Sequence, residues 1–220
     1  MNSLHKTVDI FCISLGIEKE NNDSLYRICN DLNISAYKVN CFLHTTLFQG
    51  ATVSRGKIIK WAQSGKSAIR DIATLRSLKI WDKRIKDIGS LYTGRFDNRL
   101  QAICLEHRNS NYIRCLSQKI LEDLKEECLI VDINDLNLHS NLNFNTKYAI
   151  DYQYSAQAGN IVPHTTLGFI DSSELTRSKK DALLDSLQRI NINHSAIYIT
   201  SLNEYCMTPL VGRHKVIDLY

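Results

Sequence analysis

The sequence predicts a protein of alternating strands and helices, built from two similar halves with a cleft between them. The main observation is a repeat: residues 44–47 read His-Thr-Thr-Leu, and residues 164–167 read the same. The chain has 7 histidines, so chance alone would give about 0.004 such repeats. Strand and helix patterns of similar order surround both copies, which indicates a pseudo-symmetric duplication.

The composition limits the class of protein. A hydrophobic fraction of 44% and a charged fraction of 23% exclude a disordered chain, a collagen and a coiled coil. The apolar run 8–17 contains Asp9 and precedes three charged residues, so it predicts neither a membrane span nor a signal peptide. We therefore expect a single cytoplasmic domain over residues 1–220, monomeric and without a membrane partner.

Charge and cysteine content narrow the chemistry further. The net charge of +4 permits a phosphate-bearing ligand without demanding one. None of the 7 cysteines forms a C-x-x-C pair, so the sequence supports neither a zinc ribbon nor a dithiol redox site. Most of them lie in apolar runs, and we expect reduced thiols that pack as small hydrophobic residues. A catalytic cysteine has no local signature in its favour.

The first half begins with an alternating pattern over residues 8–15, which predicts a strand. Residues 22–24 read Asn-Asp-Ser and can cap a helix whose apolar residues recur at helical spacing. These apolar residues are Leu25, Ile28 and Leu32. After the first repeat, residues 57–78 predict a second helix, which Gly65 breaks or bends.

The second half opens with two predicted strands, 83–92 and 99–108, which residues 93–98 join as in a hairpin. Ser110 can cap a helix that turns four apolar residues inward. These inward residues are Ile113, Leu116, Ile120 and Leu124. After the second repeat, Ser173 can cap a helix that reaches about residue 190.

Two strands, over residues 196–201 and 214–219, end the predicted order of elements. Between the halves, residues 130–160 are rich in asparagine and predict a long loop or an insertion. A functional lid and a solvated connection both fit such a segment. The predicted lobes are residues 1–80 with the C-terminal strands, and residues 81–190.

The two repeats place similar side chains together. Side chains along a strand alternate between its two faces. His44 and Thr46 therefore share one face of their strand, as do His164 and Thr166. Each copy offers an imidazole beside a hydroxyl, and we expect the two strands to lie close together in the middle of the molecule.

Two imidazoles on opposite sides of a substrate suit general acid–base catalysis, because histidine exchanges protons near neutral pH. Threonine hydroxyls can donate hydrogen bonds to phosphoryl oxygens. The expected reaction is attack by a 2′-hydroxyl or a water on a phosphodiester, without metal or cofactor. Two histidines without an H-E-x-x-H motif are too few for a metal site. The lack of a G-x-S-x-G motif argues against a serine triad.

The motifs H-T-T-L at 44–47 and P-H-T-T-L at 163–167 resemble the paired H-x-T-x motifs of the two-histidine (2H) phosphoesterase superfamily. The resemblance implies an α+β fold of two pseudo-symmetric lobes, each an antiparallel sheet with outer helices, around a central cleft. It further implies catalytic and phosphate-binding roles for the repeated residues. These are His44 and His164 as the acid–base pair, and Thr46 and Thr166 at the scissile phosphate.

Four further residues are candidates for substrate contact. In a regular strand Phe48 shares the face of His44 and could stack on a base, although core packing explains it equally well. Arg55 follows a Gly-containing turn and could reach a phosphate. Tyr205 and Arg213 lie in the connection between the last two strands, where the resemblance implies substrate contacts. A plain surface position is the alternative for these last three.

The sequence therefore predicts a phosphodiesterase for a nucleotide with a 2′ linkage or a 2′,3′-cyclic phosphate. RNA ends, 2′-5′ oligoadenylates and cyclic oligonucleotides are the expected substrates. The alternative is a non-catalytic module of the same fold that binds a nucleotide or an RNA end. An RNA ligase is the third hypothesis, disfavoured because cleavage dominates in dilute solution.

Overall fold

The computed structural model describes residues 9–17, 19–36, 43–65, 67–70, 85–89, 100–106, 110–132, 153, 155–190, 194–201 and 214–218. The strands are β1 (Asp9–Ile17), β2 (Ser35–Ala36), β3 (His44–Thr52), β4 (Ile85–Gly89), β5 (Leu100–Glu106), β6 (His164–Asp171), β7 (His194–Ser201) and β8 (His214–Asp218). The helices are α1 (Lys19–Asp31), α2 (Arg55–Gln63), the 3-10 helix η1 (Ala68–Arg70), α4 (Ser110–Glu126) and α7 (Arg177–Gln188).

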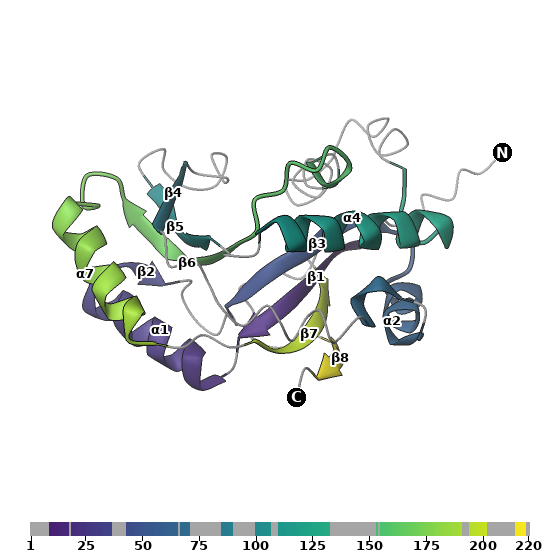
Figure 1. Ribbon diagram of the computed structural model, residues 1–220, viewed down its shortest axis with the longest axis horizontal. Coiled ribbons are helices and arrows are strands. Elements are labelled where there is room, and N and C mark those ends of the chain that lie inside the picture. Colours follow the sequence, from purple (N-terminus) through teal and green to yellow (C-terminus); the bar gives the residue numbers. More distant parts are fainter. Residues whose placement is uncertain are drawn as a thin grey trace.

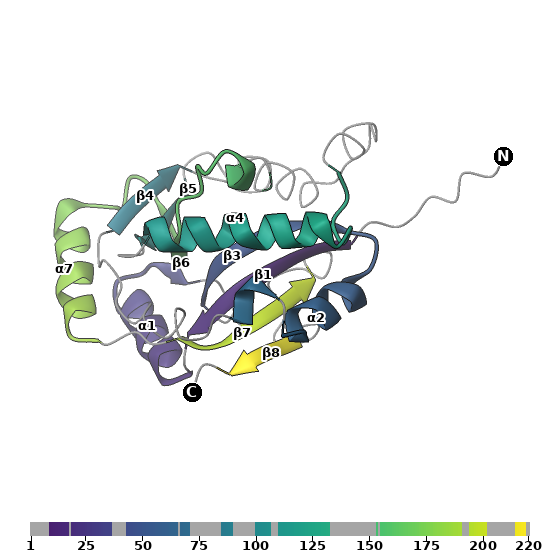
Figure 2. The ribbon, with the colours of Figure 1, turned by 45° about the vertical axis from the view of Figure 1, so that its right-hand side comes forward.

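All the described strands belong to one antiparallel sheet with helices packed on it (Figures 1 and 2). The strand order is β4-β5-β6-β3-β1-β7-β8, and the short β2 pairs with β6. The expected α+β class is confirmed. The sheet is nearly divided in the middle, because β3 and β6 pair through Thr45 and Thr165 alone, whereas the flanking strand pairs run over several residues.

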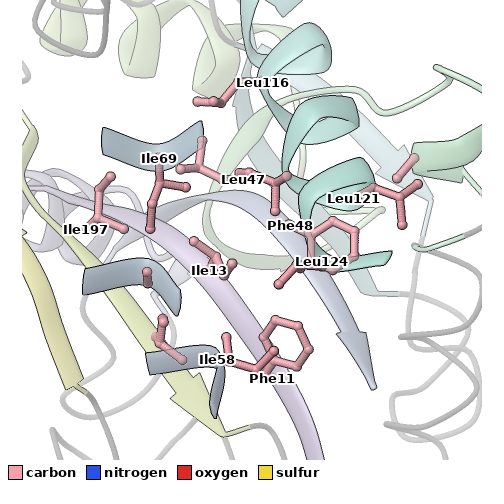
Figure 3. Packing of buried hydrophobic residues seen from close by; sticks show 14 of the residues in the cluster. Phe11, Ile13, Leu47, Phe48, Ile58, Ile69, Leu116, Leu121, Leu124 and Ile197 are labelled. Atoms are coloured by element: carbon pink, nitrogen blue, oxygen red, sulfur yellow. The ribbon is translucent and has the colours of Figure 1, made fainter. Parts of the chain in front are cut away.

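The hydrophobic core consists of two clusters. The first packs β1, β3 and β7 against α2, η1 and α4, and Figure 3 shows ten of its residues by name. The second packs β5 and β6 against α1 and α7, which lie side by side in Figures 1 and 2. Thus α1 follows β1 but packs with the other half of the sheet, and α4 follows β5 but packs with β1 and β3. Each cluster therefore combines elements from residues 1–80 with elements from residues 81–190.

Several predicted elements are confirmed. The strands predicted at 83–92 and 99–108 correspond to β4 and β5, which pair antiparallel. The helix predicted from Ser110 is α4, and its four inward residues are all buried. Helix α2 ends at Gln63, just before Gly65, as the expected break predicts. Residues 71–78, the last part of the helix predicted over 57–78, lie outside the described residues.

Two predicted helix starts are wrong. The Ser24 hydroxyl donates to the Glu20 carbonyl from inside α1, which already begins at Lys19. Helix α7 is capped by Thr176, whose Oγ1 accepts from the Lys179 amide at 3.2 Å. Ser173 instead donates to Asp171 from its hydroxyl at 2.7 Å and from its amide at 2.9 Å. Ser24 thus bonds to a carbonyl of its own helix, and Ser173 bonds within the turn before α7. A serine hydroxyl can form such local bonds in place of a helix cap.

Most of the predicted loop at 130–160 lies outside the described residues, which here cover 130–132, 153 and 155–160. The described helices include none with the length and apolar character needed to cross a membrane.

Candidate functional site

The two repeats lie on neighbouring strands in the middle of the sheet. Thr45 of β3 pairs with Thr165 of β6, and the strands run antiparallel. Continuing that register brings His44 toward Thr166, and Thr46 toward His164. The threonines of the central pair are fully buried, whereas the histidine and the second threonine of each repeat are only half-buried. The expectation that the repeat strands meet in the middle is confirmed by this pairing.

Both repeat strands carry the same β-bulge. Thr46 pairs with Ser14 of β1, but Phe48 pairs with Ile13, so Leu47 is the extra residue. In the second copy Thr166 pairs with Cys104 of β5, and Gly168 pairs with Ile103, so the extra residue is Leu167. A bulge leaves one residue outside the ladder. In the first copy Ser117 of α4 donates its hydroxyl to the freed Leu47 carbonyl. The duplication therefore extends from the motif letters to an irregularity of the backbone.

The bulge corrects the role expected for Phe48. Regular alternation would place it on the face of His44 and Thr46. The extra residue Leu47 shifts the alternation by one, and Phe48 turns to the other face. There it is fully buried, 5.9 Å from Phe11 between ring centroids, within the first core cluster (Figure 3). Phe48 is thus a core residue and is not placed to stack on a base.

A cysteine accompanies the second threonine of each repeat. Cys12 Sγ of β1 lies 3.8 Å from Thr46 Oγ1. Cys104 Sγ of β5 lies 3.5 Å from Thr166 Oγ1. Both thiols are buried, with exposed fractions of 4% and 0%. A thiol is a weak hydrogen-bonding group. These contacts therefore orient the two hydroxyls, which can still donate to a stronger acceptor such as a phosphoryl oxygen.

The orientation of His164 follows from its backbone. Its Nδ1 lies 2.7 Å from the Val162 carbonyl. A carbonyl only accepts, so Nδ1 carries the proton and donates it to this bond. The neutral ring then presents Nε2 as the atom that can take up a proton.

A buried polar group joins the two halves of the sheet. The Thr45 and Thr165 hydroxyls lie 2.9 Å apart, and Thr45 Oγ1 is 3.3 Å from Nε2 of His194. Thr165 Oγ1 also donates to the His44 carbonyl at 3.1 Å. His194 is 5% exposed. We call Thr45, Thr165 and His194 the seam group. Its threonines were visible in the sequence as repeated letters, but His194 stands alone and carries no such signal.

The structure does not bring Arg55 to the repeats. Arg55 opens α2, beyond the far end of β3. The six steps along the chain from Thr46 to Thr52 span about 20 Å of strand. A long strand therefore separates Arg55 from the repeats along the chain, and the phosphate contact expected from Arg55 stays a prediction. Tyr205 and Arg213 lie outside the described residues.

The described residues contain no candidate metal centre, and the buried cysteine of α1 is not a reactive thiol. Among them, no three His, Cys, Asp or Glu side chains gather closely enough to hold a metal ion. Burial raises the pKa of Cys29 to about 12, so this thiol stays protonated and is a poor nucleophile.

Comparison with known proteins gives limited matches. No protein-family profile and no curated protein sequence matches the chain. Among solved structures, the chain is similar to Kluyveromyces marxianus Usb1 with uridine monophosphate, at 11% identity and a TM-score of 0.41, over 96% of this chain and 98% of that one. A second structure of Kluyveromyces marxianus Usb1 gives 9% identity and a TM-score of 0.36, over 95% and 97%.

Proposed function

We propose that the chain is a metal-independent phosphodiesterase whose catalytic residues are His44 and His164. The observation that carries the proposal is the pairing of the two repeat strands at Thr45 and Thr165. It supports a single reaction centre, because each half-buried histidine then lies toward the half-buried threonine of the other copy. Both copies retain the imidazole and the hydroxyl, and general acid–base chemistry uses both imidazoles.

The proposed substrate is a nucleotide or RNA with a 2′-linked or 2′,3′-cyclic phosphodiester. One neutral histidine removes the proton from the attacking oxygen, which is a water or, in a 2′-linked chain, the neighbouring 3′-hydroxyl, as the new P–O bond forms. The other histidine, protonated, gives its proton to the leaving oxygen as the old P–O bond breaks. The hydroxyls of Thr46 and Thr166 donate hydrogen bonds to the non-bridging oxygens, whose negative charge grows in the transition state. Proton exchange with water then restores both histidines.

A non-catalytic nucleotide-binding module is the second candidate. The seam group is compatible with this candidate, because its two buried threonines and buried histidine would hold the backbone of a binding site as well as that of an active site. Turnover separates the two candidates, because a binding module needs no proton transfer.

The test is a product assay by chromatography in the presence of excess chelator. Wild type and His164→Ala each receive nucleoside 2′,3′-cyclic phosphates, 2′-5′ and 3′-5′ oligoadenylates, and cyclic di- and trinucleotides. We expect wild type to cleave one class with chelator present and the variant to lose that activity. Activity that disappears with chelator and returns with added metal would overturn the mechanism. Folded wild type that binds a probe without cleaving it would favour the binding module.

A further inference from the structure

A row of side chains continues from Thr46 across three strands. Thr46 pairs with Ser14 of β1, Ser14 pairs with Tyr198 of β7, and Tyr198 pairs with Lys215 of β8. Residues directly opposite each other on antiparallel strands lie on the same face. The row Thr46, Ser14, Tyr198 and Lys215 therefore lies on one face of the sheet, the face that also carries His44.

Burial separates the two faces at β7 and β8, but not at β1, where Ser14 of the row is only 1% exposed. Ile13, Ile197 and Ile199, the sequence neighbours of the row, are fully buried in the first core cluster. Tyr198 is only half-buried, and Lys215 is exposed. A register shift between the Ile197 and Tyr198 pairs brings Lys215 opposite Tyr198. This bulge therefore places Lys215 on the same face of the sheet as Tyr198. The bulge at Leu47 has the opposite effect, because it moves Phe48 to the other face.

A second row beside the first contains polar atoms without partners. Gln49 pairs with Cys12, and Cys12 pairs with Thr200. The Gln49 Nε2 and Thr200 Oγ1 atoms are buried and lack a hydrogen-bond partner among the described residues. Buried polar atoms are almost always bonded. These two atoms lie on either side of Cys12 on this face, as enclosed polar groups that the described residues leave unsatisfied.

We propose that Tyr198 and Lys215 form the recognition side of the site and bind an oligonucleotide. Strand spacing places Tyr198 about 10 Å and Lys215 about 14 Å from β3 across the sheet. The tyrosine ring packs on a base or a ribose, and the ammonium binds the phosphate next to the scissile one. This inference rests on the proposed function, in which Thr46 holds the scissile phosphate. It narrows the substrate class to chains with at least two phosphates, not nucleoside cyclic phosphates.

The test is equilibrium binding by fluorescence anisotropy in the His164→Ala background, which prevents cleavage of the probe. The probes are fluorescein-labelled 2′-5′ and 3′-5′ triadenylates. Tyr198→Ala is expected to weaken binding about 5- to 100-fold, whereas Tyr198→Phe, which keeps the ring, stays within about twofold. Lys215→Gln is expected to weaken binding and to reduce the slope of log K against log salt by about 0.7. Lys125→Gln, an exposed lysine of α4 in the helix layer, is the matched control and should change neither.

The outcomes separate this inference from the proposed function. Unchanged affinity and salt slope in Lys215→Gln and unchanged affinity in Tyr198→Ala would overturn it, even if wild type cleaves the triadenylates. Lack of binding of both probes would overturn it as well. If Tyr198→Ala does not fold, the affinity and salt slope of Lys215→Gln, a substitution at an exposed position, decide whether the inference holds. Binding that depends on both residues without cleavage by wild type would support the inference and overturn the proposed function.

Discussion

The two halves of the sheet share the residues of the proposed reaction centre and differ in what lies beyond them. Both have the histidine and threonine of the repeat, a leucine bulge after them, and a cysteine within 4.0 Å of the threonine. Outward from Thr46 the next strands carry Ser14, Tyr198 and Lys215. Outward from Thr166 the register continues only to Cys104 and Lys86. The two halves thus share the backbone geometry around the repeat, whereas the side chains of the proposed recognition side lie in one half only of the described sheet.

The surroundings of the two histidines also differ. Gly16 of β1 pairs with His44, whereas Glu106 of β5 pairs with His164. The first histidine thus has no side chain opposite it on that strand, and the second faces a carboxylate-bearing residue. The two imidazoles thus occupy equivalent backbone positions but have different neighbours on the adjacent strand. This difference gives the sequence a means to assign the acid role to one histidine and the base role to the other.

Removal of either imidazole has the largest expected effect. His44→Ala and His164→Ala should each lower kcat/KM about 10²- to 10⁴-fold, the usual loss for a general acid or base. The measurement is steady-state turnover of the substrate found by the product assay, with circular dichroism to verify folding. His194→Gln, in the seam group, is the control for loss of a histidine outside the reacting pair. A folded variant of either catalytic histidine with wild-type rates would show that the two halves do not share one reaction centre.

Truncation of Phe48 should act on stability rather than on substrate binding. Phe48→Ala is expected to lower the free energy of unfolding by about 3–5 kcal/mol, as for a fully buried aromatic ring. Leu167→Ala, at the bulge of the other half, should cost about 2–5 kcal/mol. Urea denaturation measures both. A Phe48 variant with normal stability and a KM raised at least tenfold would return Phe48 to the substrate side and contradict the bulge.

The sequence predicted what depends on local pattern. Strand alternation, the apolar face of α4 and the repeat all follow from spacing, and the repeat alone pointed to four residues of the proposed site. The error over Phe48 has a different cause. A bulge depends on the partner strand, since only pairing with Ser14 and Ile13 reveals that Leu47 is the extra residue.

Long-range packing also escaped the sequence. Which half of the sheet receives α1 or α4 depends on the apolar faces that both halves present, and neither helix encodes its destination. Tyr198 and Lys215 were missed for the same reason. Nothing near either residue along the chain marks the face that it shares with Thr46, and only the strand order does.

The pH dependence of turnover should distinguish the halves. If one histidine must be neutral, kcat/KM falls about tenfold for each pH unit below the pKa of that histidine. If the other must be protonated, kcat/KM falls about tenfold for each pH unit above the pKa of that second histidine. Wild type should therefore give a bell-shaped profile, whose two limbs belong to the pair together. In His44→Ala and His164→Ala the residual activity should each lose a different limb. Loss of the same limb in both variants, or a flat wild-type profile, would contradict complementary roles for the two halves.

The smallest expected effect concerns the seam group, where the halves meet. Thr45→Val and Thr165→Val each remove one hydroxyl from a buried hydrogen bond and should each lower the free energy of unfolding by about 1–3 kcal/mol. The double variant removes both partners at once, so its cost should fall short of the sum by about 0.5 kcal/mol or more. Urea denaturation of all four proteins completes the cycle. Strict additivity would mean that the 2.9 Å contact between the hydroxyls contributes no coupling between the halves.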